Sequence, residues 1–167
     1  MMLTGTLSRF CLLTALLAIS LTAAHAEPCR KAADDVVQIA TTELLQKVLE
    51  DDPALAEMDE NALVLQAGKR LMESPRPDLK ARGWMMLLWY GDKTEHDLVA
   101  KSAETLQTEE DRAHLYFVMG LYQLTASTAD TAAGGRDLLA KVKDTGKVTF
   151  VPDEMWTMFL ETCELPG

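Results

Sequence analysis

Six prolines divide this chain into segments that carry a helical pattern of apolar residues. Proline is disfavoured inside a helix but tolerated in its first turn, so the prolines should mark helix ends. Between Arg30 and about Glu50, apolar residues recur every three or four positions, the spacing of an amphipathic helix. Only Val148 to Val151, β-branched and aromatic, suggests an extended segment, which we expect to pack on the helices. The predicted fold is all-α, with about seven helices in antiparallel hairpins that form a bundle or a short helical-repeat-like array.

Capping signals place the starts of the expected helices. A side-chain oxygen at the N-cap accepts a hydrogen bond from a free backbone N–H in the first turn. Polar residues suited to this role precede four of the expected helices: Asn61, Thr94, Thr108 and Asp153. The Gly134-Gly135 pair should weaken or delay the helix expected over residues 131–143, because glycine is a poor helix former.

The first 26 residues have the layout of a secretory signal peptide. Arg9 precedes an uncharged run from Phe10 to Leu21, and Ala24-His25-Ala26 supplies a small-x-small cleavage site. The apolar run is shorter than the roughly 20 residues that span a bilayer. No cysteine stands where a lipoprotein signal would need it, so no membrane anchor is expected. We therefore expect an exported protein, periplasmic or secreted, with a single domain over residues 27–167.

Two cysteines lie near the ends of the expected domain. Cys11 falls in the predicted signal peptide, which leaves Cys29 and Cys163. An even pair in an exported chain predicts a disulfide, because oxidising compartments form and keep such bonds. Two free thiols, or a bridge to another chain, are the alternatives.

The charge balance is acidic, with a formal net charge of −10. A basic footprint for nucleic acid is absent, and phosphate backbones would be repelled, so no nucleic-acid partner is expected. An acidic surface steers a protein toward basic partners, although a merely solvated surface would carry the same charge.

Motifs for catalysis or for a cofactor are missing from the sequence. His96 and His114 lack the close ligand spacing of a zinc site, and there is no nucleophile elbow or phosphate-binding loop. Paired carboxylates such as Asp34-Asp35 would suit a hydrolase, but their positions in helix first turns explain them as capping charges. The sequence therefore predicts a protein that is not an enzyme and has no cofactor.

Methionines and aromatic residues leave two kinds of binding open. Thioethers suit copper(I), yet they also fill gaps in cores. The methionines in question are Met85, Met86, Met119, Met155 and Met158. Aromatic side chains are common interface anchors. The candidate binding surface consists of Trp84, Trp89, Tyr90 and Tyr122. Trp84 and Trp89 project about 140° apart on one helix, so one of them faces a groove unless that helix is surrounded.

The stretch from Ala113 to Lys143 resembles one hairpin of a tetratricopeptide or Sel1-like array. Tyr116, Met119-Gly120 and Ala132 lie where that family has an aromatic, an apolar-plus-small pair and a small residue. Tyr122 is one position early, Gln123 and Arg136 replace expected aromatics, and no second copy recurs at a fixed period. The resemblance implies protein–protein binding on a concave face, whereas an ordinary bundle would show the same helix pattern.

These features favour a non-catalytic exported protein that binds another protein, as a scaffold or adaptor. A sharper version is an inhibitor or immunity protein that blocks a basic secreted toxin. The alternative is a carrier of a small ligand or of copper, using methionines and aromatics between helices.

Overall fold

The computed structural model describes residues 28–51 and 53–167; the predicted signal peptide, residues 1–26, lies outside them. Over this part the chain forms seven α-helices and no strand, which confirms the all-α prediction. The elements are α2 (Cys29–Asp51), a 3₁₀ turn η1 (Pro53–Glu57), α3 (Glu60–Met72), α4 (Pro77–Tyr90), α5 (Lys93–Ala103), α6 (Glu109–Leu124), α7 (Ala129–Thr145), α8 (Asp153–Thr157) and a π-helical turn η2 (Met158–Thr162). None of the described helices is long and apolar enough to cross a membrane.

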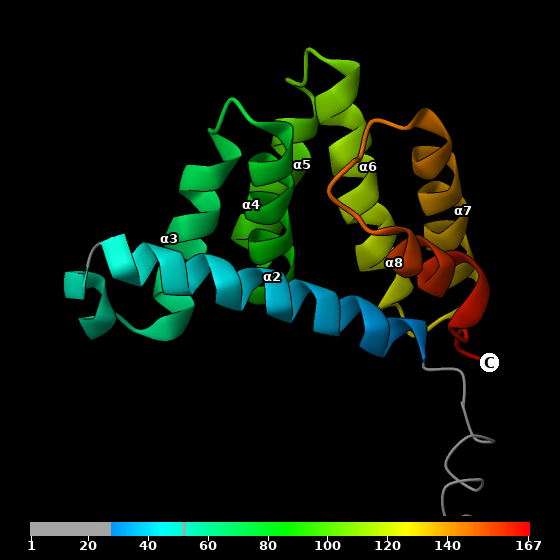
Figure 1. Cartoon of the computed structure of the whole chain (residues 1–167), viewed down its shortest axis with the longest axis horizontal. Helices are drawn as coiled ribbons and strands as arrows, with labels where there is room; N and C mark the ends of the chain where they lie inside the picture. Colours follow the sequence, from blue (N-terminus) through cyan, green and yellow to red (C-terminus); the bar gives the residue numbers. More distant parts are fainter. Residues whose placement is uncertain (1–27, 52) are drawn as a thin grey trace, which may run out of the picture.

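Two antiparallel hairpins, α3–α4 and α6–α7, stand side by side, and α4 packs against both α3 and α6 (Figure 1). The long helix α2 crosses them and contacts α3, α4 and α6, while α5 packs against α4. After α7 the chain returns across α6 to reach α8 (Figure 1). Helices from both hairpins therefore meet α2 at one shared face.

Each hairpin has a point of close backbone approach between two glycines. A side chain on Gly83 would place its Cβ 2.7 Å from the carbonyl oxygen of Gly68, and one on Gly135 would lie 2.7 Å from that of Gly120. Real Cβ atoms do not come this close, so only glycine permits these crossings. The expectation that Gly134-Gly135 weakens or delays α7 is wrong: the helix runs unbroken from Ala129, and Gly135 serves the crossing.

The two crossings share one register, offset by 52 positions (68 to 120 and 83 to 135). Leu87 packs beside Gly68 as Leu139 packs beside Gly120, and these leucines have the same offset. The same shift relates the last residues of α3 and α6, and the first residues of α4 and α7. The hairpins thus repeat each other in structure, which the sequence did not reveal because so few side chains match between them.

Helix starts agree with the predicted caps at one position and differ at three. Thr108 accepts the Asp111 N–H and caps α6, as predicted. Asp59 and Asp92, rather than Asn61 and Thr94, cap α3 and α5. Both aspartates lie two residues upstream of the predicted cap, and each carboxylate accepts a first-turn N–H there, so both helices begin earlier. The N-cap of α8 is Pro152, and Asp153 is instead the first helical residue.

The two ends of the described chain are joined. Cys29 and Cys163 form the predicted disulfide, with Cα atoms 4.8 Å apart, and the Cys29 N–H donates to the Glu164 carbonyl at 2.9 Å. Arg136 of α7 donates to the carbonyl oxygens of Cys163, at 2.6 Å, and Phe159, at 3.1 Å. A charged side chain here satisfies carbonyls that the end of a helix leaves free. The start of α2, the middle of α7 and the C-terminal turn are thus held as one unit.

The adjacent glycines of α7 provide a test of the crossing. Gly135→Ala should destabilise the protein by about 1–3 kcal/mol, because its Cβ meets backbone atoms of α6. Gly134→Ala should instead stabilise it by about 0.5–1 kcal/mol, because alanine is the better helix former and the new Cβ meets only the far end of Gln123, at 3.8 Å. Urea unfolding of the two variants measures both changes. Changes of the same sign and size would contradict the proposed role of the crossing.

Candidate functional site

An apolar groove of about 170 Å³ opens where α2, α4, α6 and the segment before α8 meet. We call it the Ile39 groove. Its lining residues are mostly aliphatic or aromatic: Val36, Ile39, Ala40, Glu43, Arg82, Met85, Phe117, Phe150, Val151 and Met155. The groove thus combines side chains from chain segments far apart in the sequence.

One wall of the Ile39 groove is a face of α2. Val36, Ile39, Ala40 and Glu43 follow one another at spacings of three, one and three residues, which places them on the same side of a helix. Ile39 is 60% exposed and is one of two large apolar side chains, with Tyr116, that are exposed in the described part of the chain. Ile39 was not among the predicted site residues. The helical spacing of Val36, Ile39 and Glu43 indicates that they share one face of α2, but it does not indicate that Ile39 is exposed.

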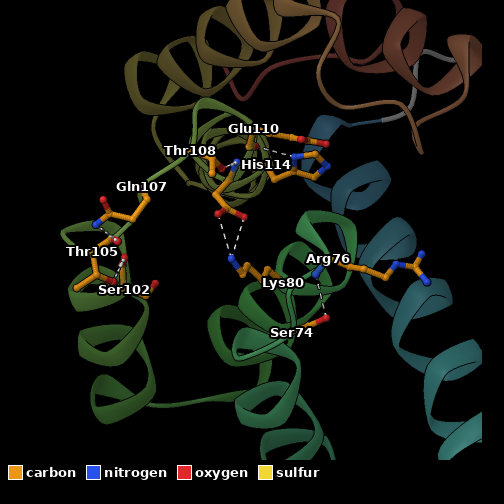
Figure 2. Close-up of polar contacts among 10 residues, drawn as sticks. Ser74, Arg76, Lys80, Ser102, Thr105, Gln107, Thr108, Glu110 and His114 are labelled. Carbon is orange, nitrogen blue, oxygen red and sulfur yellow. Dashed lines mark hydrogen bonds and ion pairs between the residues drawn. The ribbon is translucent and has the colours of Figure 1, made fainter.

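The floor of the groove comes from both hairpins. Met85 of α4 and Phe117 of α6 are buried there. Figure 2 shows how the start of α6 is tied to α4: Lys80 reaches across the helix interface. Its ammonium group lies 3.0 Å from both carboxylate oxygens of the buried Asp111. This partly buried ion pair links the two helices that form the floor.

The second wall is the segment that links α7 to α8. Phe150 stacks on the ring of His114, with centroids 5.6 Å apart, and meets Phe117 edge-on at the same distance. His114 is itself buried, and its Nδ1 donates to the Glu110 carbonyl at 2.8 Å (Figure 2). Val151 is buried beside Phe150, which agrees with the predicted packing of residues 148–151 on the helices. Aromatic contacts therefore hold this wall in place.

Two charged residues line the groove, the half-buried Arg82 and the exposed Glu43. Neither makes an ion pair with another described residue. The site therefore offers an apolar cavity for a side chain or a small molecule, with one cation and one anion at hand for polar groups of the same ligand.

Of the four aromatic residues predicted to form a binding surface, one is buried in the core and three are half-buried against it. Trp84 is 1% exposed and therefore belongs to the core, where its indole N–H has no hydrogen-bond partner among the described residues. Trp89 and Tyr122 are half-buried and in edge contact, with ring centroids 5.3 Å apart. Trp89 also donates to Asp34 of α2 at 2.9 Å. Tyr90 packs against the main core, as Trp89 and Tyr122 do, and also against the small cluster of Val64, Ala67 and Met86. These aromatics join helices to one another.

The histidines and most of the methionines have structural positions. His96 donates through Nε2 to the Leu88 carbonyl at 3.1 Å, and His114 donates through Nδ1 to the Glu110 carbonyl. Within the described residues, no group of three or more histidine, cysteine or acidic side chains could hold a metal ion. Met85 and Met86 are buried, and Met155 and Met158 are partly buried against the core.

Comparison of the chain with protein-family models, curated proteins and solved structures found no match. The function is therefore inferred from the residues of the chain itself.

Proposed function

We propose that this protein acts by binding another protein, which inserts an apolar side chain into the Ile39 groove. The observation that carries the proposal is a large aliphatic side chain, 60% exposed, beside a cavity with a buried apolar floor. Central apolar pockets that accept an anchor residue supply most of the binding energy in many protein interfaces. Binding of this kind requires no catalytic group.

Charge supports a basic partner. The chain carries a formal net charge of −10, and Glu43 at the groove is exposed without an ion pair inside the described part of the molecule. An acidic surface accelerates encounter with a basic partner and repels acidic ones. Residues around the groove would then discriminate between partners that offer similar apolar anchors.

An exported location fits this proposal. The disulfide between Cys29 and Cys163 is of the kind that persists in a periplasm or outside the cell, and residues 1–26 have the layout of a signal peptide. A domain closed on itself by this bond loses little freedom on binding, which favours tight complexes. An inhibitor or immunity protein that blocks a secreted enzyme is the sharpest form of the proposal.

Photocrosslinking at adjacent positions of α2 tests the groove. We expect p-benzoylphenylalanine at Ile39 to capture one protein partner that the same probe at the exposed neighbour Gln38 does not, because the two side chains point about 100° apart. With the purified partner, Ile39→Glu should raise the Kd about tenfold or more, since it puts a charge beside an apolar pocket. Gln38→Glu adds the same charge outside the groove and should change the Kd less than about twofold.

Circular dichroism should show both variants folded, since both positions are exposed. Equal capture at the two positions, or an Ile39→Glu variant that binds as well as the original chain, would remove the groove from the binding site. If the partner is an enzyme, its loss of activity in the complex would distinguish an inhibitor from a scaffold.

A second candidate function is carriage of copper(I) or a small apolar ligand in the same groove. Met85 and Met155 both line it, which places two soft thioether groups beside one cavity. Copper(I) should then change the tryptophan fluorescence saturably, and Met155→Leu should abolish the change while keeping the apolar volume. A titration without a saturable change would eliminate the copper version.

A further inference from the structure

The repeated hairpin has one face that is covered in the first copy and open in the second. In the first hairpin, Val64 and Met86 are 2% and 1% exposed. They belong to a buried cluster against which Leu44 and Leu45 of α2 pack. A helix that presents two adjacent leucines thus covers this face of α3 and α4.

In the second hairpin, the 52-position offset places Tyr116 and Leu138 at the corresponding sites. Tyr116 is 49% exposed and Leu138 is only partly buried. The identical glycine crossings put these side chains on α6 and α7 where Val64 and Met86 stand on α3 and α4. A large aromatic and an aliphatic side chain are therefore presented to solvent on a face that, in the other copy, packs against a helix.

This open face is hollowed. A groove of about 420 Å³ runs between α6 and α7, and we call it the Tyr116 groove. Its lining mixes apolar and basic residues: Glu109, Arg112, Ala113, Tyr116, Leu138, Lys141, Val142, Thr145 and Lys147. The depression and the exposed Tyr116 coincide, so shape and apolar surface mark the same place.

The charge around the Tyr116 groove is opposite to that of the whole chain. Arg112, Lys141 and Lys147 line it in a protein of net charge −10, against the single acid Glu109. Lys147 lies 3.1 Å from the Glu109 carboxylate. The hydrogen bond and charge of Lys147, with the charge of Arg112, hold the pKa of Glu109 below its ordinary value. The basic side chains around the groove would attract a negatively charged ligand, whereas much of the remaining surface is acidic and would repel it.

We propose that the Tyr116 groove docks an amphipathic helix of a partner protein, with apolar residues on one face and acidic residues on its flank. The apolar face would cover Tyr116 and Leu138 as Leu44 and Leu45 cover the first hairpin. The acidic flank pairs with Arg112 and Lys141, neither of which has an ion-pair partner among the described residues. This second site involves a different face from the Ile39 groove and does not depend on the function proposed for it.

The second half of α2 supplies a probe. A synthetic, fluorescein-labelled peptide of residues 36–51 contains Leu44, Leu45 and three acidic residues, Glu43, Glu50 and Asp51. Its binding to the whole purified chain, with the disulfide intact, is followed by fluorescence anisotropy. We expect saturable binding that weakens as salt is added, because part of the attraction is between charges.

Two lysines of α7 give matched variants. Lys141→Glu, in the groove, should raise the Kd of the peptide about tenfold. Lys143→Glu makes the same charge change on the same helix outside the groove and should raise it less than about threefold. Tyr116→Ser should weaken binding about as much as Lys141→Glu. All three positions are exposed, so the folded state tolerates the changes.

The proposal fails if the peptide does not bind saturably, or if the two lysine variants weaken binding equally. It also fails if Tyr116→Ser has no effect, since the peptide would then be displacing α2 from the first hairpin. A Leu44→Asp/Leu45→Asp peptide that binds as well as the original, with heparin competing, would show that the groove recognises negative charge alone and no helix.

Discussion

Close contact between helix backbones, at Gly68 with Gly83 and at Gly120 with Gly135, is the constraint on which the rest of this fold depends. With no side chain between them, the two helices of each hairpin approach until backbone and leucine side chains fill the space. Both hairpins use the same crossing, and contact between α4 and α6 places them side by side, with α2 lying across them. The floor of the Ile39 groove exists because α4 and α6 meet there.

The groove also needs its two walls to stay opposite each other. One wall belongs to the start of the domain, in α2, and the other to residues 150–155 near its end. The Cys29–Cys163 disulfide and the hydrogen bonds of Arg136 join the start of α2 to the C-terminal region. A bond that closes so long a loop removes much conformational freedom from the unfolded chain, by about 4–5 kcal/mol in the chain-entropy account. The disulfide thus stabilises the fold and helps to keep the two walls of the Ile39 groove in place.

Local signals predicted the local structure well, because prolines, apolar spacing and cysteines act on their own segments. The all-α fold, the disulfide and the Thr108 cap follow from them. Exposure does not, because it depends on which helix covers which face. Trp84, which we expected at a binding surface, is buried in the core. Ile39, which was not among the predicted site residues, is 60% exposed. Gly135 was misread for a similar reason, since its role lies in a contact with another helix.

Methyl NMR of isoleucine tests the central claim, that a partner occupies the Ile39 groove. The sequence contains two isoleucines, Ile19 and Ile39, and the first lies in the predicted signal peptide. A chain that begins at Glu27 would therefore give one isoleucine δ1-methyl signal, which reports directly on the groove. If the partner binds there, this signal should shift or broaden in step with complex formation. A signal that stays unchanged when the partner is saturated would place the binding surface elsewhere on the molecule.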